Sequence, residues 1–183
     1  MTTLSPLRQR FILHWGEMGS RWGINRSMAQ IHALLLTSEQ PLSAEDIVDT
    51  LGIARSNIST SLRELQGWGI VRVQHQVGDR RDYFITETDP WTLFRTIARI
   101  RLQREVSPTL ELLREANAQD SAPEDRYTVE RMQALAEFFE MAMSWFHTID
   151  ALPTPLLKAF LEAGPSINRW MGGGQPPSAA SPS

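Results

Sequence analysis

The sequence predicts a mainly α-helical protein that carries one small β-hairpin. Apolar residues recur at helical spacing along most of the chain, whereas residues 70–76 alternate valines with polar residues, which is the period of a half-buried strand. The chain has 183 residues, 42% of them apolar, and is therefore long enough to bury a core. We expect one helical domain with a hairpin, extended by further helices.

The composition excludes several classes of protein. The chain has no cysteine, which excludes disulfide frameworks, thiolate metal sites and cysteine nucleophiles. Its apolar runs are too short to span a membrane. Arg8 and Arg10 stand where a secretory signal would need an apolar segment. We therefore expect a soluble, cytoplasmic protein that does not bind a membrane.

Two helices are expected within residues 5–37. They would meet near Gly16, Gly19 and Gly23, and this glycine cluster suits close helix packing or a helix junction. The second helix carries apolar residues at a spacing of three and four, which predicts a core face. These residues are Ile24, Met28, Ile31, Leu34 and Leu35.

A short helix is expected next, over Ala44–Leu51. Ser43 and Asp46 have the spacing of a capping box, in which the hydroxyl accepts an N–H at the helix start and the carboxylate reaches back. Gly52 can adopt the left-handed conformation that ends such a helix.

A helix with one polar side is expected over Arg55–Gly67. Its apolar side, formed by Ile58, Leu62 and Leu65, would anchor it to the core. Ala54 has no side-chain oxygen to cap the helix start, so we expect Ser56 or a shifted start to compensate.

A hairpin follows this helix. Residues 70–76 form its first arm, and the β-prone residues 83–86 pair back as its second arm after a turn at Gly78. This arrangement places Arg80 and Arg81 at or beside the hairpin tip.

The remainder of the chain is expected to be helical and to form a dimer. Asp89 and Pro90 mark a helix start, and Pro108 must kink or break that helix. After a polar connection over residues 117–125, residues 127–148 form an aromatic-rich helix. Its apolar face is wide enough to pack on its own chain and on a partner chain, so we expect a homodimer.

The order of these elements is that of a winged helix-turn-helix with helical dimerisation extensions. The helix Arg55–Gly67 would enter the major groove of double-stranded DNA, and the hairpin arginines would lie at a flanking minor groove. Residues 53–81 hold five arginines and two acidic residues, although the formal net charge of the whole chain is −3. The candidate DNA-binding residues are Arg55, Ser56, Asn57, Ser59, Thr60, Arg63, Arg80 and Arg81.

These patterns divide the chain into four parts. Residues 1–22 form an N-terminal helix for packing or dimerisation, and residues 23–89 form the DNA-binding domain. Residues 90–163 form the dimerisation and possible sensor region, ending in a short helix over residues 153–163. Residues 164–183, which end in the uncharged run GGGQPPSAASPS, are expected to be a disordered tail.

The chain resembles the MarR superfamily of bacterial transcriptional regulators, and its GbsR branch in particular. The resemblance covers about residues 8 to 116 and is carried by GINRSMAQ from Gly23, PLSAEDI from Pro41, LGIARSNISTSLREL from Leu51, GDRRDY from Gly78 and DPW from Asp89. It implies a winged-helix domain, helical extensions that build the dimer, and operator binding by two recognition helices. In some relatives it also implies a response to choline-like compounds.

Aromatic residues are the candidates for a sensor site. The chain has six tryptophans, and an aromatic cage could bind a quaternary ammonium group such as that of choline. Aromatic residues at helical spacing are nevertheless more often part of a core or a dimer interface. We expect any ligand to bind between the N-terminal helices and the C-terminal helices, with Trp15, Trp22 and Trp91 as candidate contacts.

We expect the DNA-binding regulator to be a repressor, and two other classes of function fit the sequence less well. The four histidines are scattered, and His14 with Glu17 is a single helical pair where a metal site needs further ligands. The sequence has no P-loop, dinucleotide turn or nucleophile elbow, so no enzyme, metal or cofactor is expected. The alternative is a winged-helix protein–protein interaction scaffold without DNA binding. Such a scaffold would not need the basic hairpin tip.

Overall fold

The computed structural model describes residues 4–118 and 125–171, and the chain falls into two compact units, residues 1–104 and 105–183. The N-terminal helix and the helix after the hairpin both belong to the first unit. The sequence-based division had separated these two helices, at residues 22 and 90, from the winged helix-turn-helix.

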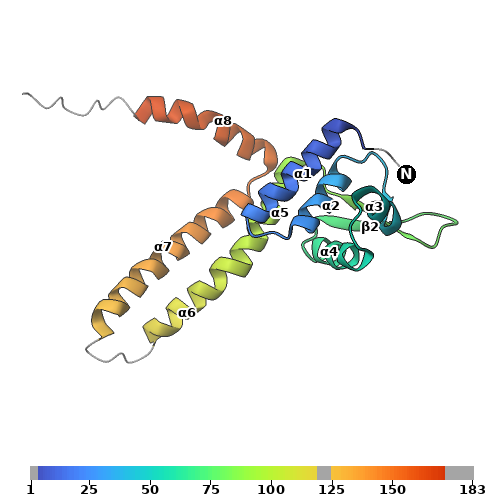
Figure 1. Ribbon diagram of the computed structural model, residues 1–183. Coiled ribbons are helices and arrows are strands. Elements are labelled where there is room, and N and C mark those ends of the chain that lie inside the picture. The colour runs from blue at the N-terminus through green and yellow to red at the C-terminus, as the bar shows by residue number, and fades with distance from the viewer. Residues whose placement is uncertain (1–3, 119–124, 172–183) are drawn as a thin grey trace, which may run out of the picture. The chain divides into compact units, whose positions relative to one another are not determined.

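The first unit combines helices with a small sheet, which confirms the expected fold class (Figure 1). Its elements are α1 (Pro6–Arg21), α2 (Arg26–Leu36), β1 (Leu42–Ser43), α3 (Ala44–Leu51), α4 (Arg55–Gly67), β2 (Val71–His75), β3 (Asp82–Thr86) and α5 (Pro90–Arg101).

Glycines allow α1 and α2 to pack closely. Gly16 and Gly19 are buried in α1, and a Cβ added at Gly19 would lie 2.6 Å from the Cβ of Ala29 on α2. Such a distance is shorter than real Cβ contacts, so only glycine fits there. Gly23 lies in the turn that joins the two helices, as expected.

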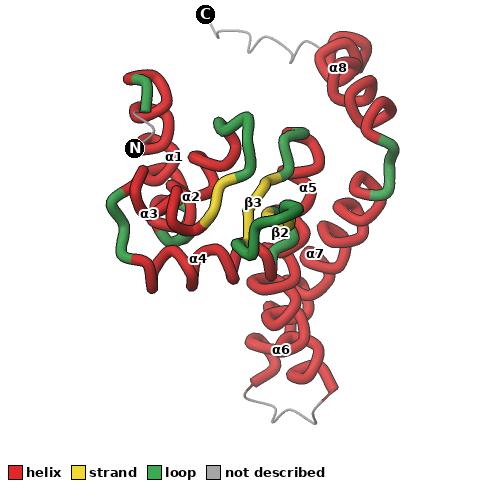
Figure 2. The backbone as a smooth tube through the Cα atoms, turned by 90° about the vertical axis from the view of Figure 1, so that its right-hand side faces the viewer, coloured by secondary structure: helices red, strands yellow, loops and turns green. Residues whose placement is uncertain are grey.

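The sheet has one strand more than the expected hairpin. The strand order is β1-β3-β2, with both pairs antiparallel. Figure 2 shows the strands in yellow, with β2 and β3 labelled. In β1, Leu42 pairs with Phe84 and Ser43 pairs with Tyr83. A strand of two residues has no periodicity of its own, which is why the sequence did not predict it.

The helix-turn-helix forms with the expected boundaries. The Ser43 Oγ accepts a hydrogen bond from the backbone N–H of Asp46 at 3.2 Å, and the Asp46 carboxylate accepts one from the N–H of Ser43 at 2.9 Å. Gly52 ends α3 in the left-handed conformation, with φ of 65°. The start of α4 differs from the expectation, because Ala54 is its N-cap and no side chain caps it. Neither Ser56 nor a shifted start compensates.

The core of the first unit lies between α2, α3, α4 and the sheet. Ile31, Ile47 and Ile58, from the three helices, are fully buried. Leu62, Leu65, Val71 and Phe84 continue this core onto the sheet. The apolar side of α4 therefore faces inward, as its spacing predicted, and this fixes which side of α4 faces solvent.

Pro108 interrupts the regular α-helix that begins at Pro90. After α5, residues Leu102–Val106 form a π-helical turn, and α6 (Ser107–Ala118) follows. Proline has no N–H to donate, and its ring collides with the carbonyl four residues earlier in a regular α-helix. The wider π-helical turn accommodates Pro108, and the boundary between the two units falls within this turn.

The second unit is built around a helical hairpin. Helices α6 and α7 (Arg126–Asp150) lie side by side (Figure 1). Leu110 and Leu113 of α6 and Ala136 of α7 are buried between them, and Arg114 pairs with Glu140 at 2.9 Å. The expected connection over residues 117–125 falls mostly on residues 119–124, which are not among the described residues.

Helix α8 spans Thr154–Met171. It therefore continues past residue 163, where the sequence had placed the end of the last helix. The remainder of the expected tail, residues 172–183, lies outside the described part of the chain. No helix in the described ranges has the length and apolar character that crossing a membrane requires.

Candidate nucleic-acid interface

The outward side of α4 presents six of the eight residues that the sequence proposed for DNA contact. Because Ile58, Leu62 and Leu65 anchor one side of the helix in the core, the side chains on its opposite side face solvent. The exposed candidates are Arg55, Ser56, Asn57, Ser59, Thr60 and Arg63.

Two of the six are already engaged by neighbouring elements. The Arg55 guanidinium forms an ion pair with Glu45 on α3, and this pair lowers the pKa of the Glu45 carboxyl. The Asn57 amide donates a hydrogen bond to the Ser27 Oγ on α2 at 3.1 Å. These contacts connect the start of α4 to α2 and α3, so both residues help to orient the helix.

The other four side chains remain available to contact a molecule that binds to this surface. Ser56, Ser59, Thr60 and Arg63 make no side-chain hydrogen bond or ion pair with the described residues. Hydroxyl groups can donate to and accept from base edges and phosphates, and a guanidinium can bind guanine or phosphate through two hydrogen bonds. This chemistry suits a DNA groove.

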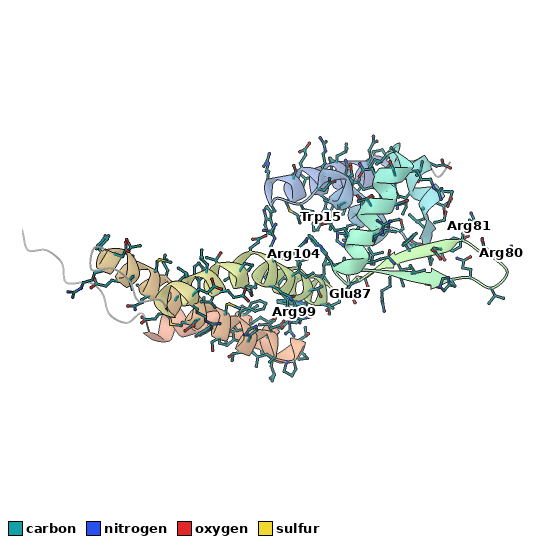
Figure 3. The ribbon with its side chains drawn as sticks, turned by 90° about the horizontal axis from the view of Figure 1, so that it is seen from below. Trp15, Arg80, Arg81, Glu87, Arg99 and Arg104 are labelled. Atoms are coloured by element: carbon teal, nitrogen blue, oxygen red, sulfur yellow. The ribbon has the colours of Figure 1, made fainter. Side chains whose placement is uncertain are left out.

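Arg80 and Arg81 lie at the far end of the hairpin formed by β2 and β3, as expected from the sequence (Figure 3). They differ in their surroundings. Arg80 is exposed and makes no hydrogen bond or ion pair with the described residues. Arg81 Nε donates to both carboxylate oxygens of Asp79, to Oδ1 at 3.1 Å and to Oδ2 at 3.0 Å, and Nη2 donates to Oδ2 at 2.6 Å.

Tyr83 completes a hydrogen-bonded network with this pair. Its hydroxyl donates to Asp79 at 2.8 Å and accepts from Arg81 at 2.5 Å. The hydrogen bonds from Arg81 hold the pKa of the Asp79 carboxyl well below its usual range, and the bond to Asp79 raises the pKa of Tyr83. The network braces the hairpin turn, so Arg81 positions the turn while Arg80 projects from it.

Helix α4 and the hairpin enclose a groove of about 370 Å³. Arg55, Arg63 and Arg81 line it, together with Ser59 from α4 and Glu45 from α3. The structure therefore brings three of the predicted arginines to one hollow. Arg55 and Arg81 are paired with Glu45 and Asp79, so Arg63 is the arginine of the groove without an ion pair among the described residues, and its charge favours an anionic backbone such as that of DNA.

A second hollow in the first unit is apolar. It has a volume of about 440 Å³, and residues of α1, α2, α4 and α5 line it. Trp15 and Trp22, two of the three tryptophans proposed as ligand contacts, are among them. Trp91 does not line the cavity, whereas Trp68 and Phe94 do.

His32 is the polar side chain deepest in the wall of this cavity. It is only 4% exposed, and its Nδ1 accepts a hydrogen bond from the indole N–H of Trp15 at 3.2 Å. Burial lowers the pKa of His32 to about 4, so the ring is neutral near pH 7. Sequence reasoning missed this residue, because a histidine on the apolar side of α2 looks like an ordinary core residue.

Asp79 and Tyr83 are the other residues that the sequence analysis missed. Asp79 and Arg81 lie in the turn before β3, so the period of a strand could not have indicated that they meet Tyr83. The described residues hold no cluster of three or more histidine, aspartate or glutamate side chains suited to a metal ion.

Comparisons with known proteins agree with this geometry. Residues 22–82, which contain the helix-turn-helix and most of the hairpin, match the model of the MarR family. The search of curated proteins found no significant match.

Solved structures provide the comparison of folds. A crystal structure described as a transcriptional regulator superimposes with a TM-score of 0.58 at 23% identity, covering 76% of this chain and 94% of that one. MepR of S. aureus, solved in complex with DNA, aligns with a TM-score of 0.37 at 16% identity over 76% of this chain and 92% of its own.

BpsR of Bordetella bronchiseptica, whose DNA binding is described as regulated by 6-hydroxynicotinic acid, aligns with a TM-score of 0.34 at 14% identity over 91% of this chain and 88% of its own. Of these three structures, the first establishes the likeness of fold. The chain thus has the fold of a winged-helix transcriptional regulator, and its residues 22–82 are similar to the MarR family.

Proposed function

We propose that this chain is a cytoplasmic transcriptional regulator of the MarR superfamily that binds a specific sequence of double-stranded DNA. The observation that carries the proposal is the exposed face of α4, on which Ser56, Ser59, Thr60 and Arg63 stand without partners among the described residues. Three buried anchors fix that face on the outside of the unit. Arg80, at the tip of the adjacent hairpin, supplies a second point of contact.

The two contact points suit two grooves. Helix α4 in the major groove would direct Arg63 and the hydroxyl side chains at base edges. The hairpin would then extend along the duplex, so that Arg80 reaches the negative channel of the neighbouring minor groove. Under this proposal the protein is a regulator rather than an enzyme.

We further propose that the regulator acts as a homodimer through α7. Ala136, Met132, Phe139 and Met143 pack toward α6, whereas a second apolar face of α7 is exposed. This second face consists of Leu135, Phe138, Met141 and Trp145, with exposures from 49% to 61%. Exposed apolar area of this extent is typical of a surface that a partner covers.

A homodimer would read an operator with two similar half-sites. Two recognition helices enter successive major grooves when their half-sites are about 34 Å apart, so the operator would be a pseudo-palindrome. As a repressor that responds to a small molecule, the dimer would release DNA when a ligand favours another spacing of the two helices.

The apolar cavity of the first unit is the site that we assign to such a ligand. The GbsR resemblance points to choline or a related quaternary ammonium compound, and Trp15, Trp22, Trp68 and Phe94 offer aromatic faces to a cation. Choline is therefore a compound to test as a ligand of this cavity.

A binding titration tests the proposed function. Fluorescence anisotropy would compare the DNA upstream of the chain's own gene with a shuffled duplex of equal length at physiological salt. We expect an affinity at least about 10³-fold higher for the natural duplex. Equal binding to both, together with failure to bind any other promoter duplex, would favour the protein-interaction scaffold instead.

A further inference from the structure

The apex of the hairpin carries an apolar residue. Val77 and Gly78 are the two central residues of the turn between β2 and β3. The backbone N–H of Asp79 closes this turn by donating a hydrogen bond to the carbonyl oxygen of Gln76 at 3.2 Å. Gly78 has φ of 84°, a left-handed conformation that favours glycine at this turn position. Val77 therefore supplies the side chain at the apex.

The turn is held in place by the residues that follow it. The Asp79 carboxylate accepts a hydrogen bond from the backbone N–H of Arg81 at 2.9 Å, in addition to those from the Arg81 guanidinium and the Tyr83 hydroxyl. A surface that is ordered before binding loses less conformational entropy when it binds. Val77, which is fully exposed, is thus presented on a braced turn.

Valine is an unusual residue for the centre of a turn. Turn centres favour proline, glycine, asparagine, aspartate and serine, and an exposed isopropyl group gains nothing by packing in the free protein. A single exposed apolar residue is common on protein surfaces, so the place of Val77 matters more than its exposure. It lies three residues before Arg80, at the end of the element that the proposed function directs into a minor groove (Figure 3).

The minor groove distinguishes A·T from G·C base pairs by one group. Both pairs present acceptor atoms there, and G·C adds the 2-amino group of guanine, which is a donor. Because an isopropyl group cannot accept a hydrogen bond, an amino group covered by Val77 would lose its water without gaining a partner. An A·T pair has no such donor and leaves more room for the two methyl groups.

We propose that Val77 determines specificity by selecting A·T base pairs where the hairpin meets the minor groove, whereas Arg80 binds there without regard to sequence. This role rests on the proposed function and adds base recognition to the hairpin. The DNA site then has A·T pairs flanking the half-sites that α4 contacts in the major groove. Proteins that bind the minor groove frequently place apolar side chains against the bases.

Three duplexes isolate the effect of the 2-amino group. They share half-sites that the natural chain selects from random DNA, and they differ only in the flanking pairs, which are A·T, inosine·C or G·C. Inosine is guanine without the 2-amino group, so inosine·C resembles G·C in the major groove and A·T in the minor groove. In anisotropy titrations at physiological salt, we expect the first two duplexes to bind about equally and the G·C duplex about fivefold more weakly.

Variants assign this difference to Val77. Val77→Thr keeps the shape of the side chain and replaces one methyl group by a hydroxyl, which can accept a hydrogen bond from the guanine amino group. The G·C and inosine·C duplexes should therefore bind equally to this variant. Val129→Thr makes the same change on α7, in the second unit, and should keep the fivefold difference. Arg80→Ala should weaken all three duplexes and keep it as well.

A fivefold difference that survives in Val77→Thr, or one that disappears in Arg80→Ala, would overturn the proposal, because Arg80 sensing the groove width would then account for the preference. Equal binding of all three duplexes by the natural chain would also overturn it, and would leave the proposed function intact because the DNA is still bound. If the natural chain binds none of the duplexes, the proposed function fails, and the role of Val77 fails with it.

Discussion

Arg63 and Arg80 are both exposed arginines, but their positions predict different consequences when they are removed. Arg63 lies on the face of α4 that would meet base edges, so Arg63→Ala should weaken operator binding by about 1–3 kcal/mol and relax the preference at one base pair. Arg80 lies on the hairpin, where it would meet the negative minor groove that every sequence presents. Arg80→Ala should weaken binding to all sequences evenly and reduce the salt slope by about one unit.

The matched control for both variants is Arg10→Ala, which removes an exposed arginine from α1, outside the interface. It should leave affinity, sequence preference and salt slope unchanged. Anisotropy titrations over a series of salt concentrations give all three quantities. If Arg63→Ala weakens binding to all DNA sequences equally, Arg63 contacts a phosphate rather than a base.

The Asp79–Arg81 pair predicts that the Asp79 carboxyl titrates at a lower pH than an ordinary aspartate. Arg81 lowers the pKa of the Asp79 carboxyl, so the folded protein should keep this carboxylate ionised while ordinary aspartates, with pKa values near 4, take up a proton. The stability that the pair contributes is present above the pKa of the unfolded chain and is lost only as pH falls through the lowered pKa of the folded state.

Carbon NMR of the Asp79 carboxyl over a pH titration measures this directly. In Arg81→Ala the main cause of the shift is removed, and the midpoint should return toward about 4. A midpoint near that value in the natural chain would show that the Arg81 bond does not persist in solution, and that Arg81 is as free as Arg80 to contact DNA.

At the scale of the element, α4 is a helix whose start lacks a cap. Ala54 occupies the N-cap position with backbone angles of −55° and 136°, and no side chain accepts the first N–H groups. Ala54→Ser supplies an acceptor there and should raise the free energy of unfolding by about 1 kcal/mol. Ser43→Ala, which removes the corresponding cap of α3, should lower it by a similar amount.

Urea unfolding of the two variants and of the natural chain measures these changes in the free energy of unfolding. An unchanged midpoint for Ala54→Ser, with the expected loss for Ser43→Ala, would mean that the exposed N–H groups of α4 are already satisfied by solvent.

The elements that sequence reasoning located correctly are those with a strong local signal. The α3 and α4 boundaries followed from the capping box, Gly52 and the apolar spacing of Ile58, Leu62 and Leu65. The strand β1 was missed because it pairs with residues of β3 that lie some forty positions away in the sequence. Two residues alone carry no pattern that would reveal such a pairing. The end of α8 was placed too early, at residue 163, because Gly164 and Pro165 follow there and usually end a helix, whereas α8 continues to Met171.

The candidate site shows the same distinction. Exposure of the α4 residues follows from helical periodicity, and was predictable. The cavity was predictable only as a region, because α1, α2, α4 and α5 all contribute to it and one sequence does not reveal which side chains meet. Trp22 reaches the cavity and Trp91 does not, although both are single tryptophans near a helix end.

At the scale of the whole molecule, the exposed face of α7 predicts the oligomeric state. Phe138→Glu places a charge within this face, and we expect it to turn a dimer into a monomer at micromolar concentration, because the buried charge would lack a partner. Operator affinity should fall with it. Gln133→Glu introduces the same residue on α7 outside both apolar faces and should leave the dimer intact.

Sedimentation velocity of the natural chain and the two variants determines the outcome. A natural chain that is monomeric at these concentrations would remove the dimer from the proposal, and a Phe138→Glu dimer would move the interface to another surface.

The central claim is that two copies of α4 read one DNA duplex. Selection from a pool of random duplexes, followed by sequencing of the bound fraction, tests it without knowledge of the operator. We predict enrichment of an inverted repeat whose half-site centres are about one helical turn, or 10–10.5 base pairs, apart. Bound duplexes with no shared sequence, or no duplexes retained at physiological salt, would contradict the claim.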